Sequence, residues 1–301
     1  MKFIALKLSD GKNKGKLSFY CRVLQVSRQG FYEYIKRQNK PWKYEELAKL
    51  IYEILAEDIF NDSYGRSRMY DALKFKKEIE NLDIKIPSNS TVYRIMKKLG
   101  IARKKKHKSN GITKADKKAR KSDGLLKRDF KADAPFQKCV TDITEIPAKD
   151  GKLYVSAIFD CFDASVLRDN MKAELCVQTV INAYESYPEI KGAIIHSDRG
   201  SQYTSEEYRA IIGKYGIIQS MNSDGGRCHD NARCESMWAR MKEELLYGRY
   251  KTKYMTIEEI KTIVWRYFIS YWNNRRICSS NGGIPPIAKR NQYFYSLNSL
   301  A

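Results

Sequence analysis

Residues 137–245 constrain the fold most strongly, because short β-branched segments and longer amphipathic segments follow one another there in a defined order. Three strands are predicted at 137–146, 152–160 and 165–171, the first two joined by the turn signal Asp150-Gly151. Helices and strands then alternate, beginning with a helix, at 173–186, 192–198, 205–216, 217–222 and 229–245. The order β-β-β-α-β-α-β-α predicts a mixed sheet covered by helices, an α/β layered domain.

The charge of the chain indicates a polyanionic partner. Lys and Arg number 56 against 35 Asp and Glu in 301 residues, a formal net charge of +21. Such an excess favours nucleic acid or an anionic membrane surface. A membrane is disfavoured, because no segment approaches the roughly 18 to 20 apolar residues of a spanning helix. The start MKFIALKLSDGKNKGK also turns charged before a signal-peptide core can form.

The seven cysteines are scattered along the chain and include no CxxC pair. This pattern predicts reduced thiols in a cytoplasmic protein rather than a disulfide framework. A zinc site built from His196, Cys228, His229 and Cys234 is a minor alternative, since no pair among them has the usual ligand spacing.

The first hundred residues are predicted to be all-α. Residues 17–37 fit two short helices joined by a tight turn, with Ser27 capping the second helix. That helix would present Arg28 and Gln29 near its start, where a helix-turn-helix contacts DNA, although a helical hairpin that merely packs fits equally well. Residues 44–102 contain a second helical pair. No aromatic RNA-binding signature is present, so DNA is the expected partner.

A basic segment separates the helical region from the α/β region. Residues 103–121 contain ten Lys or Arg and one acidic residue in nineteen positions. We predict a linker that lies against phosphates through Lys104, Lys105 and Lys106. The predicted domains are thus an N-terminal helix-turn-helix-like hairpin, a second helical DNA-binding segment, the basic linker, the α/β core and a C-terminal helical tail, at 1–40, 41–102, 103–130, 131–250 and 251–301.

Three carboxylates have unusual positions in the α/β pattern. Asp142 lies in mid-strand, where Asp is disfavoured, and Asp198 ends a strand, where open α/β sheets bind ligands. Glu235 lies at the edge of the apolar stripe of the helix at 229–245. An edge-strand charge, a turn cap and a surface charge would explain each alone. As a set they would repel one another unless a cation binds, and carboxylate oxygens suit Mg²⁺ or Mn²⁺.

Three sequence blocks around these acids resemble the catalytic domain of DDE transposases and retroviral-type integrases. They are TDIT at 141–144, HSDRGSQYTS at 196–205 and DNARCES at 230–236, with Lys242 behind the last. Over nearly the whole chain the sequence is similar to the OrfB-type transposases of the "IS three" group of insertion sequences. The further matching blocks are YGRSRMYDAL, STVYRIMKKLGI and the C-terminal YWNNRRICSSNGGIPPIAKR.

The resemblance implies an RNase H-like catalytic core preceded by all-α helix-turn-helix segments. It implies that Asp142, Asp198 and Glu235 are catalytic residues and ligands of two Mg²⁺ or Mn²⁺ ions. Two such ions can stabilise both the attacking and the leaving oxygen of a phosphodiester. The expected reaction is cleavage of the 3′ ends of a mobile element, followed by strand transfer.

The expected partners are transposon-end DNA and target DNA. Lys242 would contact phosphate beside the acids, with Asn231 and Arg233 as weaker candidates. The resemblance also implies a homo-oligomer on paired ends, and an upstream OrfA partner or fusion, in a cytoplasmic protein that joins the nucleoid when bound to DNA.

Two alternatives stay open from the sequence. A metal nuclease of the same fold would nick DNA without joining it. A non-catalytic helix-turn-helix regulator would bind DNA whether or not Asp142 is intact.

Overall fold

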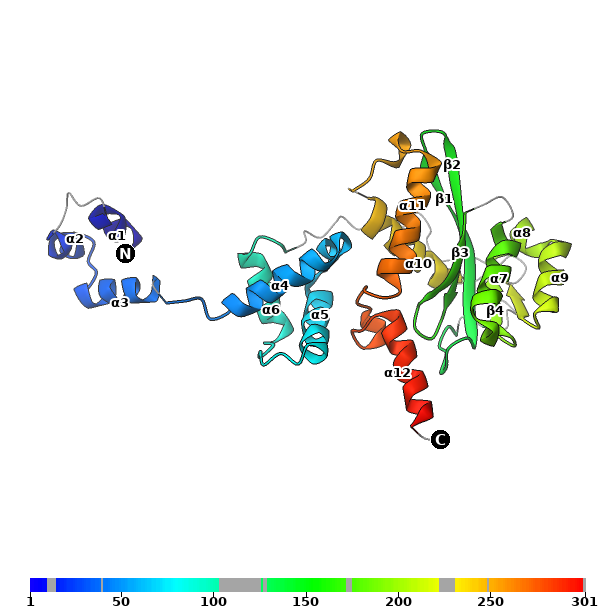
Figure 1. The fold of residues 1–301 in the computed structure, drawn as a ribbon. Helices are drawn as coiled ribbons and strands as arrows, with labels where there is room; N and C mark the ends of the chain where they lie inside the picture. The colour runs from blue at the N-terminus through cyan, green and yellow to red at the C-terminus, as the bar shows by residue number, and fades with distance from the viewer. Residues whose placement is uncertain are drawn as a thin grey trace, which may run out of the picture. The chain divides into compact units, whose positions relative to one another are not determined.

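The computed structural model describes residues 1–9, 15–38, 40–102, 126, 129–171, 175–221, 231–247 and 249–299. Contacts within the chain define two compact units, Met1–Leu50 and Ile51–Ala301, and each is described here by itself (Figure 1). None of the helices in these ranges has the length and apolar character needed to cross a membrane. The predicted contacts of Lys104, Lys105 and Lys106 fall outside the described residues.

The first unit contains the predicted helical hairpin. Its helices are α1 (Lys2–Ser9), α2 (Leu17–Val23) and α3 (Arg28–Gln38). Ile4, Cys21 and Phe31 form a small buried core among them. The Ser27 hydroxyl accepts a hydrogen bond from the Gly30 amide at 2.9 Å, which confirms the predicted cap of the second helix.

Helix α4 (Glu45–Glu57) crosses the boundary into the second unit, which continues with η1 (Ile59–Ser63), α5 (Arg66–Ile79) and α6 (Asn89–Lys98). Helices α5 and α6 pack together through their apolar faces. On α6 the buried side chains are Val92, Ile95 and Met96. The opposite side of α6 is exposed and carries Ser90, Arg94, Lys97 and Lys98.

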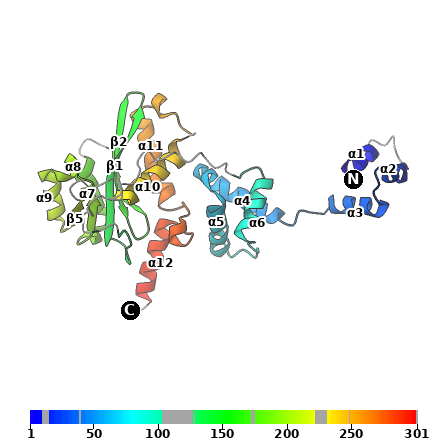
Figure 2. The same ribbon diagram turned by 180° about the vertical axis from the view of Figure 1, so that it is seen from behind.

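A five-stranded sheet with the order β3-β2-β1-β4-β5 forms the centre of the second unit (Figure 2). Strands β1 (Lys138–Ala148), β2 (Gly151–Asp160) and β3 (Val166–Asn170) are antiparallel neighbours, whereas β4 (Ile194–Ser197) and β5 (Ile218–Met221) continue parallel to β1. The predicted β1–β2 hairpin is confirmed, although its two turn residues are Lys149 and Asp150, and Gly151, at φ 144°, is the first paired residue of β2. The mixed sheet and its RNase H-like strand order agree with the predicted fold class.

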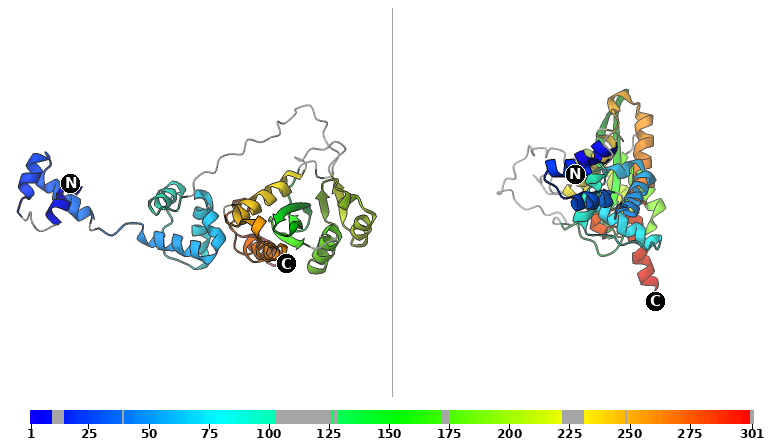
Figure 3. Two further views of the ribbon diagram at one scale, coloured as in Figure 1. Left: turned by 90° about the horizontal axis from the view of Figure 1, so that it is seen from above. Right: turned by 90° about the vertical axis from the view of Figure 1, so that its left-hand side faces the viewer.

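Helices cover both faces of this sheet (Figure 3). On one side lie α7 (Leu175–Ser186), η2 (Pro188–Ile190), α8 (Ser201–Thr204) and α9 (Glu206–Lys214), which close a core containing Cys139, Ile158, Val180, Ile195 and Ile212. On the other side Phe159 of β2 contacts the rings of Trp238 and Phe268. Because both faces are buried, the sheet holds its strand ends in fixed positions.

The second face is covered by the part of the chain that follows residue 231. Helix α10 (Ala232–Met241) runs directly into the π-helix η4 (Lys242–Leu246), and α11 (Ile257–Trp265) runs into a second π-helix, η6 (Arg266–Trp272). The short helices η5 (Thr252–Tyr254) and η7 (Ser279–Asn281) and the helix α12 (Pro286–Asn298) complete this part.

The segment predicted as a helical tail is integrated into the core. The indole of Trp272 donates to the Ala164 carbonyl at 2.8 Å. From α12, the buried guanidinium of Arg290 donates to Asp160 at 2.8 Å and to Asp163 at 2.7 Å. These bonds fix the tail to the end of β2, so the predicted tail and core share one folded unit.

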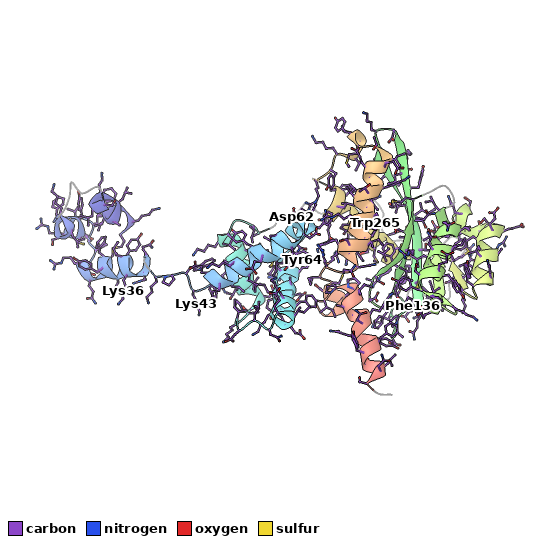
Figure 4. The ribbon with its side chains drawn as sticks, in the orientation of Figure 1. Lys36, Lys43, Asp62, Tyr64, Phe136 and Trp265 are labelled. Atoms are coloured by element: carbon purple, nitrogen blue, oxygen red, sulfur yellow. The ribbon has the colours of Figure 1, made fainter. Side chains whose placement is uncertain are left out.

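A buried carboxylate at the end of the α10–η4 helix connects three parts of the second unit. Glu244 accepts hydrogen bonds from Arg276 at 2.7 and 2.8 Å, from Tyr267 at 2.8 Å and from Arg68 of α5 at 2.9 Å. Burial alone would raise the pKa of Glu244, but hydrogen bonds and charge from Arg276 lower it to about 2. Close by lies Tyr64, which is labelled in Figure 4. Its hydroxyl accepts a hydrogen bond from the Ile277 amide at 3.1 Å.

We predict that Glu244→Gln lowers the free energy of unfolding by about 3–5 kcal/mol at pH 7, because the change leaves the Arg276 charge buried without its partner. The wild-type pKa lies below the ordinary 4.5, so this stabilisation is present above pH 4.5 and is lost as the pH falls toward 2. Urea denaturation at pH 7 and at pH 3 measures both effects.

The control is Glu258→Gln, which removes a surface carboxylate bonded to Lys261 and is expected to cost less than about 1 kcal/mol. Equal stability of Glu244→Gln and wild type at pH 7 would contradict the predicted role of this carboxylate.

Candidate active site

Asp142 lies where the β1–β4 ladder has ended. Strand β4 pairs with β1 only from Lys138 to Val140, whereas β2 continues alongside, with Ala157 opposite Asp142. The Asp142 carboxylate is partly buried and accepts a hydrogen bond from the neighbouring Ile143 amide at 2.8 Å. The mid-strand acid is therefore at an open edge of the sheet, where a ligand can approach.

Asp198 follows the last residue of β4. One of its carboxylate oxygens accepts from the Gly200 amide at 2.9 Å, just before α8 begins. A Cβ at position 200 would lie 3.1 Å from that oxygen and 3.0 Å from the Gln202 amide oxygen, so glycine suits this tight turn. The turn-capping role considered for Asp198 is thus present, and it orients the carboxylate at the strand end.

Glu235 lies in the first turn of α10. The apolar stripe predicted for this helix is confirmed, since Cys234, Trp238, Met241 and Leu245 are all buried. Glu235 itself is exposed beside that stripe. A carboxylate in the first turn is also favourable for the helix dipole, so this position alone does not distinguish a surface charge from a ligand.

The charges of Asp198 and Glu235 both act on Asp142. Burial is the largest cause that raises the pKa of Asp142 to about 6; the two other acids contribute to this rise, while the Ile143 amide and Lys242 oppose it. The strand, the strand end and the helix therefore place two acidic charges near enough to influence Asp142. Burial lowers the pKa of the half-buried Lys242, an effect that the charges of Glu145 and Asp142 oppose, which places this lysine in the region of Asp142.

The donor chemistry of this region suits a hard divalent cation. Three carboxylates offer oxygen ligands and repel one another in the absence of a cation. In the described side-chain positions, no group of three or more His, Cys, Asp or Glu is arranged so that it could hold a metal ion. Asp142 and Asp198 each have an oxygen bonded to a nearby backbone amide. Because an ionised carboxylate has about four acceptor sites, these bonds are compatible with coordination of a metal ion.

The residues of the zinc alternative do not form a common site within the described ranges. His196 is buried and hydrogen-bonded to the Ser220 hydroxyl at 2.9 Å. Burial raises the pKa of Cys234 well above its usual range, which disfavours the thiolate needed for zinc. Cys228 and His229 lie outside the described residues.

The candidate DNA contacts occupy different environments. Arg28 and Gln29 are exposed at the start of α3, where the Arg28 guanidinium donates to the Ser18 hydroxyl at 3.3 Å. Arg233 is partly buried and donates to the Cys161 carbonyl at 3.4 Å. Asn231 is buried, with 3% of its surface exposed, and donates to the Thr141 carbonyl at 3.1 Å. This burial and this bond disfavour a direct contact between Asn231 and phosphate.

Sequence reasoning missed two anchors of the helix that carries Glu235. Neither the Asn231–Thr141 bond nor the Glu244–Arg276 pair was assigned a role, although both residues of each pair lie in or near blocks that carry the family resemblance. An Asn at a helix start and an Arg in a polar segment are typical surface residues, so only their burial distinguishes them.

Residues 132–226 match the family model described as the integrase core domain. The chain is 32% identical over 277 residues to the putative transposase InsK of insertion sequence element IS150 from Escherichia coli K12, covering 91% of this chain and 93% of the relative. It is 30% identical to the 31 kDa protein of insertion element IS600 from Shigella sonnei, with 91% and 98% covered. The transposase InsF of insertion sequence IS3A from Escherichia coli K12 is 26% identical, with 88% and 91% covered.

Among solved structures, the HTLV-2 integrase catalytic core domain in complex with magnesium is 17% identical, with a TM-score of 0.37, and covers 53% of this chain and 99% of that chain. The catalytic domain of Mos1 mariner transposase is 13% identical, with a TM-score of 0.35, and covers 44% and 70%. The family assignment rests on the relatives found by sequence, because the matched regions extend over almost the whole length of both chains. The protein belongs to the OrfB-type (IS3-type) insertion-sequence transposases and is a DDE transposase with an integrase catalytic core.

Proposed function

We propose that Asp142, Asp198 and Glu235 bind the divalent metal ions of this transposase and form its catalytic centre. The observation that carries the proposal is the place of the partly buried Asp142 carboxylate just beyond the end of the β1–β4 ladder, where burial and the charges of Asp198 and Glu235 raise its pKa to about 6. A buried carboxylate with two acidic neighbours is an unfavourable arrangement in the absence of a cation. The three residues lie on a strand, at a strand end and on a helix. Regular elements of this kind can hold ligands in a more precise geometry than loops can.

The proposed reaction is cleavage of the 3′ ends of the element, followed by strand transfer to target DNA. Two Mg²⁺ or Mn²⁺ ions, when bound, would stabilise the attacking and the leaving oxygens of the phosphodiester. The three carboxylates would hold the metal ions in place, and the Lys242 ammonium beside Asp142 would attract the DNA phosphate. Water serves as the nucleophile for cleavage and the freed 3′-hydroxyl for joining, so one site suits both steps.

We propose two further DNA contacts, on the exposed helical surfaces. Arg28 and Gln29 of α3 remain candidates in the first unit. In the second unit, α6 has three basic side chains, Arg94, Lys97 and Lys98, and no acidic one, and all three are exposed. A helix with one buried apolar side and one exposed basic side suits the groove and phosphates of duplex DNA.

The assembly is proposed from the family. We propose a homo-oligomer on paired transposon ends, with an OrfA-type partner or fusion, in the cytoplasm and on the nucleoid when DNA is bound. The basic excess of +21 supports binding to long DNA.

The substitutions Asp142→Asn, Asp198→Asn and Glu235→Gln are each expected to abolish cleavage and joining while leaving DNA binding intact. Each one removes a carboxylate ligand without changing the size of the side chain. The assay uses purified protein, Mg²⁺ or Mn²⁺ and labelled DNA with the terminal repeats of the element, and separates nicked from joined products. Nicked products without joined ones would support the nuclease alternative.

Asp169→Asn is the matched control. Asp169 lies in the same row of the sheet as Asp142, with Ala157 between them. Burial raises its pKa to about 6 as well, but without a neighbouring acid. We expect Asp169→Asn to keep full activity. An active Asp142→Asn variant, or a folded but inactive Asp169→Asn variant, would contradict the proposal. Either result would show that the distinctive feature of Asp142 is its burial and not its place near two other acids.

Lys242→Ala is expected to weaken binding of end DNA and to reduce the slope of log affinity against log salt by about 0.9, the value for one lost phosphate contact. Lys242→Arg should retain the slope, because the charge is kept. Fluorescence anisotropy at several salt concentrations measures it, with Lys261→Ala on α11 as the control. A slope equal to that of wild type would exclude a phosphate contact by Lys242.

A further inference from the structure

The edge of β1 beside Asp142 has a vacant ladder position. The Gln137 carbonyl accepts from the Ile194 amide at 3.0 Å, so it points toward β4. Every second carbonyl of a strand points the same way, and the Thr141 carbonyl therefore faces the β4 side as well. The ladder, however, ends with Val140 opposite His196, because β4 stops at Ser197.

Asn231 occupies that vacant position. Its side-chain amide donates to the Thr141 carbonyl at 3.1 Å, and the side chain is buried. Asparagine is among the residues preferred at a helix N-cap, where its side chain normally accepts from the first turn. Asn231 is the N-cap of α10 but makes no side-chain capping bond. Its side chain thus bonds a neighbouring strand instead of its own helix.

Burying the Asn231 side chain in this contact costs free energy, so the Asn231–Thr141 bond is a specific feature of the fold. The Asn231 side-chain oxygen is buried and has no hydrogen-bond partner among the described residues. Burying an unbonded polar atom is unfavourable. The strand on the other side of the contact is held firmly, because the Thr141 hydroxyl donates to the Ala157 carbonyl at 3.0 Å.

The hydrogen bond joins the two elements that carry proposed ligands. Thr141 directly precedes Asp142, and Asn231 lies four residues, about one helical turn, before Glu235. The far end of the same continuous helix is anchored through Glu244. With the far end fixed, the Asn231 contact sets how closely the start of α10 approaches β1.

We propose that Asn231 is a positioning residue that holds Glu235 within reach of the metal ion that Glu235 binds together with Asp142. The inference rests on the proposed catalytic role of these two acids. Because Asn231 is buried and already bonded, it acts through the backbone of β1 and not through DNA. Its loss should change metal affinity more than DNA affinity.

The test compares Asn231→Ala with Asn281→Ala. Asn281 also buries an amide that donates to a backbone carbonyl, that of Asp163 at 2.7 Å, away from the acids. Two readouts are used: the rise of the melting temperature with Mg²⁺ concentration in the absence of DNA, and the affinity for end DNA in EDTA by anisotropy. For Asn231→Ala we expect the half-saturating Mg²⁺ concentration to rise by about 10–100-fold, with DNA affinity within about twofold of wild type.

Asn281→Ala should leave the Mg²⁺ dependence unchanged, whatever its effect on the melting temperature. Asn231→Ser serves if the alanine variant does not fold, because serine caps a helix well but is too short to reach the Thr141 carbonyl. It should show the same weakened Mg²⁺ dependence.

An unchanged Mg²⁺ dependence in a folded Asn231 variant would overturn the positioning role. A loss of DNA affinity without a change in Mg²⁺ dependence would instead indicate that Asn231 contacts phosphate. Failure of the proposed function gives a different result. In that case the wild-type protein shows no Mg²⁺-dependent stabilisation, or Asp142→Asn retains it.

Discussion

The partly buried position of Asp142, within the influence of the Asp198 and Glu235 charges, is the constraint on which the proposed site depends. Burial and the charges of its two neighbours raise the pKa of Asp142 to about 6. Like charges separate unless a cation or the surrounding fold holds them together. A transposase that binds its metal ions with three carboxylates therefore needs each carboxylate on an element with firm support.

The structure supplies that support from different directions. Asp142 lies on the long central strand β1, and Asp198 is fixed by the turn that begins α8. The helix of Glu235 is attached at its start by Asn231 and at its far end by Glu244. The Glu244 cluster also includes Arg68 of α5, so α5 and the continuous α10–η4 helix share one buried ion network.

Local patterns predicted the succession of strands and helices along the chain, the Ser27 cap and the apolar stripe of α10, because each depends on residues close in sequence. The order of the strands within the sheet was not predicted, because it depends on long-range pairing. Asp142 and Asp198 were found because acids are unusual in a strand or at a strand end, and Glu235 because it lies at the edge of an apolar helix stripe within a block that carries the family resemblance. The anchors could not be predicted in the same way. The bonded residues Glu244 and Arg276 are separated by 32 positions, and Asn231 at a helix start has the sequence signature of an ordinary cap. The integrated tail depends equally on long-range burial, such as that of Arg290 beside Asp160 and Asp163.

The central claim is that the three acids form one metal-binding site. Calorimetric titration of Mn²⁺ into the wild-type protein and into the three variants Asp142→Asn, Asp198→Asn and Glu235→Gln, each with end DNA bound, tests it most directly. The account predicts two ions per wild-type chain and a loss of sites or of affinity in every variant, with Asp169→Asn equal to wild type. Mn²⁺ binding that is the same in all the variants as in the wild type would contradict it.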